Sequence, residues 1–339
     1  MFKLRFLMPA ALAFTLSSCQ WFNHQAPATP AETPTETPLA ASPEFNADTA
    51  FAFVKAQTDF GPRTPNSAAH DKCATFIAST ARRYADTVYI QSYTATGFDG
   101  KALASKNIIA SFNPGVQPRV YVSAHWDTRP FADQDDNNKD QPIDGANDGG
   151  SGVAVMLEAL RSMQAQRPDI GVDFIFFDSE DYGQPQSSTL PPVENSYCLG
   201  SQYWATHLHV PGYKADFGIN LDMVGSADAV FLREQTSVSY ADWASQFVWN
   251  VAGRLGFSSL FQNRIAPGVT DDHLYVNRLA NIPSIDIIHY SENGFGSYWH
   301  THRDNLQVIS KETLRMVGKT VVQSIYQYSA EKKPATASK

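Results

Sequence analysis

The sequence predicts an α/β protein, a three-layer α/β/α sandwich whose central sheet is mixed, mostly parallel, and covered by helices on both faces. Segments with strand character alternate along the chain with segments of helical periodicity, which is the pattern of such a sheet. Several apolar runs end in an acid or a histidine, as expected where parallel strands reach their ligand-binding edge. The chain has 339 residues, 43% of them hydrophobic, and this is sufficient for one large domain.

The first 19 residues have the features of a bacterial lipoprotein signal peptide. A basic start precedes an apolar stretch, residues 6–16, that is too short to span a membrane. The Leu-Ser-Ser-Cys motif at residues 16–19 resembles a lipobox, which implies cleavage before Cys19 and attachment of lipid to its sulfur. We therefore expect an exported lipoprotein on the periplasmic side of the cell envelope, held at the membrane only through its lipid anchor. An ordinary secreted protein cut nearby is the alternative.

Composition divides the remainder of the chain. Residues 20–44, rich in Ala, Pro and Thr, predict a disordered linker, and residues 331–339 predict a disordered tail. A single catalytic α/β domain is expected over residues 45–330. Two cysteines in this domain do not establish a disulfide, and we expect Cys73 and Cys198 to be free, buried thiols. The net charge is −8 and no basic patch is visible, which argues against a nucleic-acid partner. We expect a monomer.

The amino-terminal half of the domain begins with helices and continues with strands. Apolar residues recur at helical spacing over residues 47–59 and 67–84, and Pro-containing pairs separate the two helices. Three extended segments follow at 87–93, 107–112 and 119–125. The acid-rich loop 133–141 lacks the central Gly of a calcium loop and is expected to be solvated surface. A helix is predicted over 152–163.

The second half repeats the alternation of strands and helices. Residues 174–177 form an apolar run that reads as a buried strand and leads into Asp178-Ser179-Glu180-Asp181. After a loop rich in proline, the pattern predicts, in order, a helix at 199–207, a strand at 217–222, helices at 240–255 and 272–279, a strand at 284–289 and a helix at 311–328.

Residues with metal-ligand chemistry stand where these predicted strands end or where the following helices begin. Adjacent carboxylates repel each other, and a cation held by Asp181, with Glu180 left free as a base, would resolve this conflict. Oxygen and imidazole ligands suit zinc. Taken singly, Asp148 could be a helix cap and His125 a packed core histidine. Their joint placement favours a metal site built from His125, Asp148, Glu180, Asp181, Asp222 and His300.

From about Phe51 to Tyr328 the chain resembles the zinc aminopeptidase superfamily. The matching motifs lie, in the family's order, at residues 123–127, 145–152, 176–181, 220–225 and 299–301. Two features resemble the bacterial glutaminyl cyclases within it, namely Thr-Asp-Asp-His at 270–273 and Trp299 directly before a ligand histidine. The resemblance implies a zinc aminopeptidase/phosphorylase-like fold.

Carried over residue by residue, the resemblance implies one zinc per chain, held by Asp148, Asp181 and His300. Glu180 is then the catalytic acid and base, Asp222 and Asp272 form a supporting catalytic hydrogen-bond network, and Trp299 lines the substrate pocket. The adjacent acids Glu180 and Asp181 stand where many relatives have two Glu residues. The ligand side chain at Asp181 is therefore shorter, but it is still a carboxylate. The loop after Asp181 lacks the pocket Trp of the animal cyclases, so the pocket wall on that side is not assigned.

The implied activity is that of a zinc-dependent glutaminyl cyclase, which converts the N-terminal glutamine of peptides and proteins to pyroglutamate and releases ammonia. The alternative is a two-zinc aminopeptidase that removes N-terminal residues. In that case His125 and Asp222 complete a second metal site, with Asp148 bridging the two ions. A third hypothesis is a lipid-anchored binding protein without activity, which the presence of the base and all three ligands disfavours.

Overall fold

Six strands form the central sheet in the order β1-β2-β4-β3-β5-β8. The computed structural model describes residues 38–332. The pairs β1–β2 and β2–β4 are antiparallel, whereas β4, β3, β5 and β8 are parallel to one another, which confirms a mixed, mostly parallel sheet. The strands span β1 (Thr87–Thr96), β2 (Ala102–Phe112), β3 (Arg119–His125), β4 (Gly171–Phe177), β5 (Phe217–Asp222) and β8 (Ser284–Ile288).

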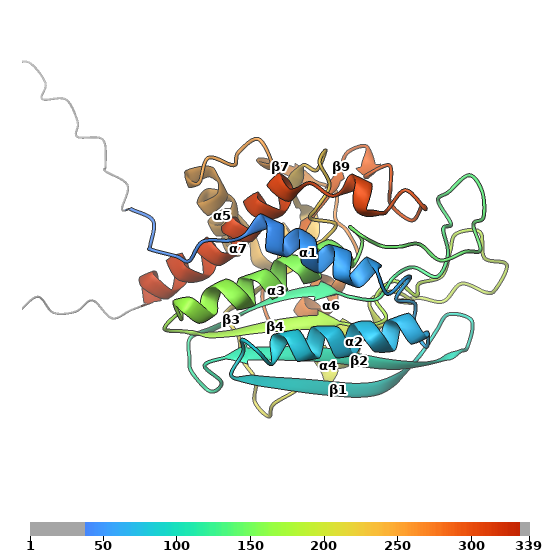
Figure 1. Ribbon diagram of the computed structural model, residues 1–339, viewed down its shortest axis with the longest axis horizontal. Helices are drawn as coiled ribbons and strands as arrows, with labels where there is room; N and C mark the ends of the chain where they lie inside the picture. The colour runs from blue at the N-terminus through green and yellow to red at the C-terminus, as the bar shows by residue number, and fades with distance from the viewer. Residues whose placement is uncertain (1–37, 333–339) are drawn as a thin grey trace, which may run out of the picture. The chain divides into compact units, whose positions relative to one another are not determined.

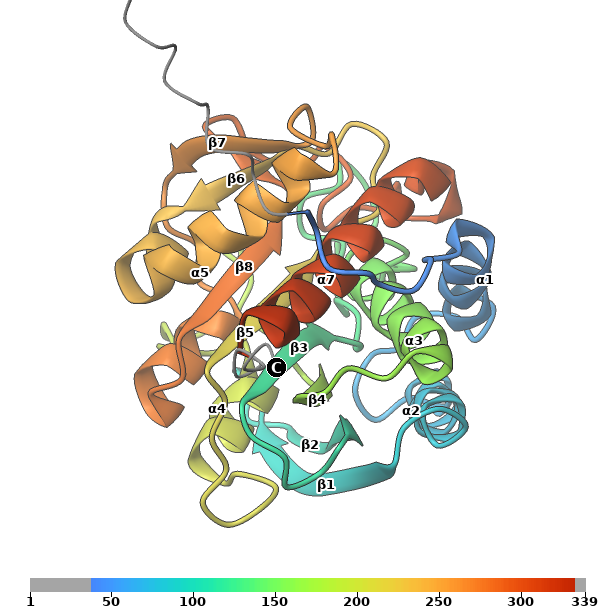
Figure 2. The same cartoon turned by 90° about the vertical axis from the view of Figure 1, so that its left-hand side faces the viewer.

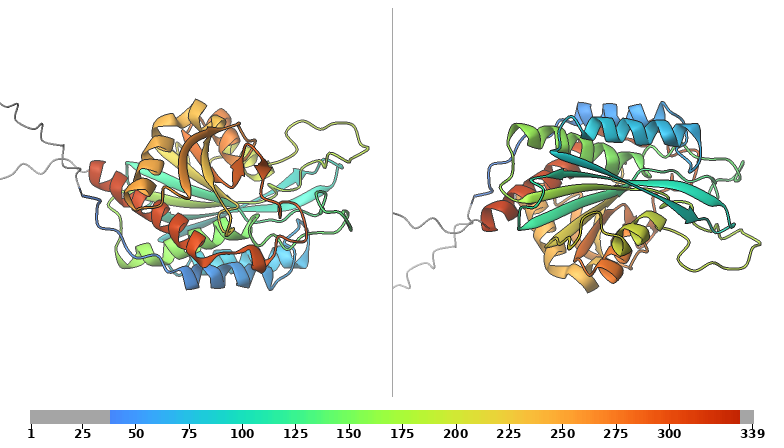
Figure 3. Two further views of the ribbon diagram at one scale, coloured as in Figure 1. Left: turned by 90° about the horizontal axis from the view of Figure 1, so that it is seen from above. Right: turned by 90° about the horizontal axis from the view of Figure 1, so that it is seen from below.

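Helices cover both faces of this sheet, as predicted (Figures 1 and 2). One face carries α1 (Ala47–Thr58), α2 (Ala68–Ala81), α3 (Gly150–Ala165) and α7 (Lys311–Lys332). The other face carries α4 (Leu199–Thr206), together with α6 (Asp272–Tyr275) and the π-helix η1 (Val276–Ala280) that continues it. The long helix α5 (Gln235–Arg254) packs against β8 and α7. Figure 3 shows the blue α1 and α2 and the yellow α4 on opposite sides of the sheet.

Successive residues of the central strands point into two separate cores. Phe174 and Phe176 of β4 pack in the core beneath α3 and α7, while Ile175 and Phe177 pack with Trp204 of α4. Because both faces are buried, these strands contain apolar residues at nearly every position and not only at alternate ones. The apolar run at 174–177 is therefore a central strand, and the acids that follow it lie at the sheet edge.

Several short elements were not predicted. β6 (Phe231–Glu234) and β7 (Phe261–Ala266) form a small parallel sheet, β9 (Tyr290–Ser291) pairs with β10 (Gly294–Phe295), and η2 (Leu306–Val308) is a 3-10 turn. α5 begins five residues before the predicted start because Glu234 caps it, with its carboxylate accepting the backbone N–H groups of Thr236 and Ser237. The polar residues of that first turn carry no apolar periodicity.

The ends of the domain differ slightly from the predicted boundaries. The linker was expected to reach residue 44, but Ala40 N–H donates to Gln327 Oε1 of α7 at 3.0 Å and Ser42 Oγ donates to Gln323 Oε1 at 2.7 Å. α7 continues to Lys332, past the predicted start of the tail. The predicted signal peptide, Cys19 and the first part of the linker lie outside the described residues, as does the tail from residue 333.

Two further expectations concern cysteines and membrane spans. Cys73 and Cys198 are free and buried, as predicted. Within residues 38–332, none of the helices combines the length and the apolar character that crossing a bilayer requires.

Candidate active site

The carboxyl ends of three neighbouring parallel strands bring most of the predicted ligands to one edge of the sheet. His125 is the last residue of β3 and Asp222 is the last residue of β5. Glu180 and Asp181 come shortly after β4, which pairs with β3 so that Phe177 lies opposite His125. This is the edge at which open α/β sheets bind ligands.

The remaining two ligands lie on loops at the same edge. Asp148 stands before Gly149, which has a φ of 85° and is followed by α3. A Cβ at Gly149 would lie 2.5 Å from the backbone oxygen of Asp127, so only glycine fits this turn. His300 lies in the loop between β10 and η2 with a φ of 53°, a left-handed conformation that residues other than glycine rarely adopt.

Asp148, Asp181 and His300 form the first group of candidate ligands. His300 Nε2 lies 3.2 Å from Asp181 Oδ1 and 3.8 Å from Asp148 Oδ2. One ligand atom from each of the three side chains lies within 4.8 Å of the other two, and all three residues are buried. The three residues predicted to hold zinc are therefore adjacent.

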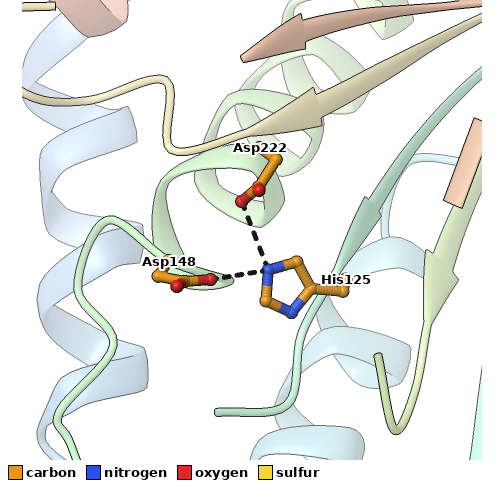
Figure 4. Close-up of side chains that lie close together, drawn as sticks. All are labelled: His125, Asp148 and Asp222. Atoms are coloured by element: carbon orange, nitrogen blue, oxygen red, sulfur yellow. Dashed lines mark hydrogen bonds and ion pairs between the residues drawn. The ribbon is translucent and has the colours of Figure 1, made fainter. Parts of the chain in front are cut away.

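Asp148 also belongs to a second group, with His125 and Asp222. Figure 4 shows the His125 ring facing both carboxylates, with Nε2 3.0 Å from Asp148 Oδ1 and 3.3 Å from Asp222 Oδ1. Asp148 thus presents one carboxylate oxygen to each group. The arrangement that a second metal ion would need is also present.

The first group fits a divalent cation such as zinc. Two carboxylates and one imidazole are ligands that zinc accepts. Asp181 Oδ2 is buried and has no hydrogen-bond partner among the described residues. Burial, reinforced by the charge of Asp148, raises the pKa of Asp181, and the same two causes raise the pKa of Asp222 to about 7. A cation would offset this repulsion and supply the missing partner of Asp181.

Backbone amides fix the acids of the site in place. Asp127 accepts the N–H of Glu180 through Oδ1 at 3.0 Å and the N–H of Asp181 through Oδ2 at 3.2 Å. Asp304 in the same way accepts the N–H groups of Asn147 and Asp148, at 2.7 and 2.9 Å. These supporting carboxylates hold the chain on either side of the metal-type ligands, so the ligands are oriented before any ion binds.

Glu180 belongs to neither ligand group and is free for acid–base chemistry. Its Oε1 accepts a hydrogen bond from Cys198 Sγ at 3.0 Å. Burial raises the pKa of Glu180 well above its usual value, aided by Asp181 and Asp271 and opposed by His125. A carboxyl group with a raised pKa both gives and takes protons near neutral pH, which suits a general acid and base.

A pocket of about 360 Å³ opens onto these residues. Trp299 lines it, with its ring centroid 4.4 Å from that of Phe295 and 3.8 Å from that of His300. The resemblance did not assign the part of the pocket wall formed by the loop after Asp181. In the structure this part consists of Gln184, Gln186 and Tyr197.

Asp271 lies in the pocket wall, whereas the predicted Asp272 does not. Asp271 lines the pocket and its Oδ2 accepts a hydrogen bond from Asn220 Nδ2 at 2.7 Å. Asp272 is the first residue of α6, is fully buried, and neither of its carboxylate oxygens has a hydrogen-bond partner among the described residues. The hydrogen-bond network of Asp222 and Asp272 stays a prediction, and the acid of this pair that lines the pocket is Asp271, the cap residue of α6.

Two polar residues outside the predicted site have unexpected surroundings. Asp133 was placed on the solvated surface, but its side chain is only 7% exposed and its Oδ1 lies 3.2 Å from His300 Nδ1. It pairs with the buried Arg129, but because residues 129–133 do not form a helix, this spacing of four residues gives no signal in the sequence. His273 was expected to make local hydrogen bonds, but its Nε2 lies 3.1 Å from Glu234 Oε1 on a distant segment.

The fold and the two groups of buried ligands define a zinc exopeptidase-like protein. The family model described as "Peptidase family M28" matches residues 107–325, and the chain belongs to this family.

Three relatives illustrate the range of named activities. The chain is 48% identical to a Zn-dependent exopeptidase from Parabacteroides distasonis, with a TM-score of 0.82 over 84% of this chain and 99% of that one. It is 45% identical to the glutaminyl cyclase of Bacteroides thetaiotaomicron bound to N-acetylhistamine, with a TM-score of 0.83 over the same shares. It is 32% identical to aminopeptidase YwaD of Bacillus subtilis over 65% of this chain, and spans less than half, 43%, of that protein.

We predict that zinc stabilises the protein more at about pH 8 than at about pH 6. Without metal, burial and Asp148 raise the pKa of Asp222 to about 7 and that of Asp304 to about 8. The folded chain then binds more protons than the unfolded chain, so its free energy of unfolding falls as pH rises through these values. His300 acts in the same direction: burial lowers its pKa, but Asp181 and Asp133 outweigh this and raise it to about 9.

Thermal unfolding of the chelated and the zinc-loaded protein across this pH range checks the prediction. The melting temperature of the chelated protein should fall with rising pH, and the difference between the two forms should widen. Groups with lowered pKa values, such as Asp133 and Asp148, are ionised throughout this range and do not contribute to the change. An equal difference at both pH values would contradict the ligand assignment.

Proposed function

We propose that this chain is a zinc-dependent glutaminyl-peptide cyclotransferase, an acyltransferase that converts the N-terminal glutamine of peptides and proteins to pyroglutamate with release of ammonia. The observation that carries the proposal is its likeness, along nearly the whole folded domain, to the glutaminyl cyclase of Bacteroides thetaiotaomicron. Trp299 in the pocket wall, directly before the candidate ligand His300, supports the same assignment.

The pocket suits a substrate that is bound by its first residue. Its volume, about 360 Å³, lies at the lower end of the usual range for ligand pockets. One glutamine side chain, folded back toward its own α-amine, fits such a volume better than an extended peptide does. The lining combines the aromatic rings of Trp299 and Phe295 with the carboxylates of Glu180 and Asp271, which can accept hydrogen bonds from the α-amine of the substrate.

In this proposal Asp148, Asp181 and His300 hold one zinc ion, which when bound acts as a Lewis acid toward the γ-carbonyl of the substrate glutamine. Glu180 takes a proton from the α-amine as its nitrogen forms the new bond to the γ-carbon. Glu180 then returns the proton to the departing amide nitrogen, which leaves as ammonia. The substrate supplies its own nucleophile, so the site needs only to hold it in a ring-closing conformation. The Nε2 atom of His125 lies between the carboxylates of Asp148 and Asp222 and keeps them oriented.

A second candidate is the two-zinc aminopeptidase, which the intact group of His125, Asp148 and Asp222 favours. In that case Glu180 serves as the base for attack by water on the first peptide bond. The two activities share a fold and most site residues, so the chemistry of the site has to decide between them.

Peptide substrates and metal content distinguish these candidates. A peptide with N-terminal Gln should release ammonia and lose 17 mass units without becoming shorter, while the matched peptide with N-terminal Leu should stay unchanged. The purified protein should contain one tightly bound zinc ion per chain. Release of free Leu, together with two tightly bound zinc ions, would favour the aminopeptidase instead.

Replacing Glu180 with Gln should remove turnover while leaving the metal site occupied. The amide keeps the size of the side chain but cannot accept the proton, so we expect kcat to fall by about 10²–10⁴-fold. Zinc content and melting temperature serve as controls and should remain close to those of the unchanged protein. Activity within a few-fold of the unchanged protein would exclude Glu180 as the acid and base.

We also propose that the protein is exported and anchored by lipid at Cys19, where it acts on the amino termini of other exported proteins. In a bacterial host fed an alkyne-labelled fatty acid, the full-length chain should carry the label and sediment with membranes. Cys19→Ala should lose the label and move to the soluble fraction. An unlabelled, soluble unchanged chain would instead indicate an ordinary secreted protein.

A further inference from the structure

A fully buried arginine joins the chain segments that carry the proposed zinc ligands. The side chain of Arg129 is 0% exposed. Its Nη1 donates to the backbone oxygens of Asp181 and Gly183, both at 2.9 Å. These two hydrogen bonds fix the path of the chain just after β4, where Asp181 must point its carboxylate into the site.

Asp133 extends this contact to the histidine ligand. Arg129 donates to Asp133 through Nε at 2.9 Å and through Nη2 at 3.2 Å, which is a bidentate pair. Asp133 Oδ1 also lies 3.2 Å from Nδ1 of His300, whose Nε2 faces Asp181 and Asp148. A carboxylate on the far side of a ligand histidine fixes both the orientation of the ring and its tautomer.

Two further hydrogen bonds from the same loop hold the backbone at and just after His300. Gln134 N–H donates to the backbone oxygen of His300 at 3.2 Å, and His302 N–H donates to Asp135 Oδ2 at 2.9 Å. His300 has a φ of 53°, and such conformations persist only where the surroundings enforce them. Residues 129–135 therefore set the position of a ligand that lies far away in the sequence.

We propose that Arg129 and Asp133 are positioning residues of the metal site formed by Asp148, Asp181 and His300, and that they set its affinity for zinc. The planar guanidinium contacts the segment of one ligand directly and the side chain of another through Asp133. Two ligands from separate loops are thereby held at coordinating distance before the ion arrives. This inference rests on the proposed metal site but not on which reaction the site performs.

The group that contains His125 is supported differently. His125 Nδ1 lies 3.6 Å from Asp127 Oδ1, a longer distance than that between His300 and Asp133. The Asp127 oxygens also accept the backbone N–H groups of Glu180 and Asp181. Changes at Arg129 and Asp133 should therefore act on Asp181 and His300 and leave the contact between His125 and Asp222 unaffected.

The test measures zinc affinity of the full chain by competition with a chromophoric chelator, well below the melting temperature. Arg129→Lys keeps the charge but loses the fork that contacts both carbonyls and the carboxylate. Asp133→Asn removes the charge beside His300 while keeping the size of the side chain. Each variant should bind zinc about 10–100-fold more weakly. Because Arg129 and Asp133 share the contact that reaches His300, the double variant should lose less than the sum of the two effects.

Arg119→Lys is the matched control. Arg119 is also buried and donates from Nη1 to both oxygens of Asp173 at 2.9 Å and from Nη2 to the backbone oxygen of Asn113, but it lies at the opposite end of β3. The Arg119→Lys substitution should lower the melting temperature and leave the zinc affinity unchanged. This separates positioning of the metal site from a general effect on folding.

The outcomes are distinct. If Arg129→Lys and Asp133→Asn hold zinc as tightly as the unchanged chain, the inference is wrong while the metal site stands. If the unchanged chain itself binds no zinc, the proposed metal site fails. If Arg129→Lys does not fold, the zinc affinity of Asp133→Asn alone tests the inference, because this substitution is a smaller change at the edge of the same network.

Discussion

The repulsion between carboxylates at one edge of the sheet is the constraint on which the site depends. Asp148, Asp181, Asp222 and Glu180 are brought together from three segments, and their side chains are largely buried around the pocket. Such a cluster is stable only if protons or a cation compensate its charge. The raised pKa values of Asp181, Asp222 and Glu180 follow from their burial and from this repulsion. Folding and metal binding are thus linked through the same side chains.

Because of Asp148, either one cation or two can compensate the charge of this cluster. Its two oxygens face two different histidines, so the same carboxylate serves a single ion or bridges a pair. The fold is compatible with either arrangement, and relatives with both cyclase and peptidase names share it. What differs is the support on the far side of each histidine, where Asp133 backs His300 more closely than Asp127 backs His125. The two histidines are therefore held by unequal supporting contacts, although both face the same carboxylate.

The sequence was informative where burial forces a simple pattern. Strands buried on both faces are apolar runs, and the residues with metal-ligand chemistry at the carboxyl ends of three of them could be located without coordinates. The sequence could not show whether Asp271 or Asp272 lines the pocket. The answer depends on which of these two adjacent acids caps α6, and both suit that position chemically. Asp133 was missed because its loop is acidic throughout, and only the buried Arg129 distinguishes it. β6 and β7 contain too few apolar residues to show a period.

The first residues of the folded domain lie at the opposite end of the sheet from the pocket. Gln166, just after α3, donates through Nε2 to the backbone oxygen of Ala41 at 3.0 Å, whereas α3 starts beside Asp148 at the site. The 16 residues of α3 separate the two ends by about 24 Å. Residues 39–42, where the folded domain begins, therefore lie far from the mouth of the pocket, and a substrate that reaches the pocket does not meet them.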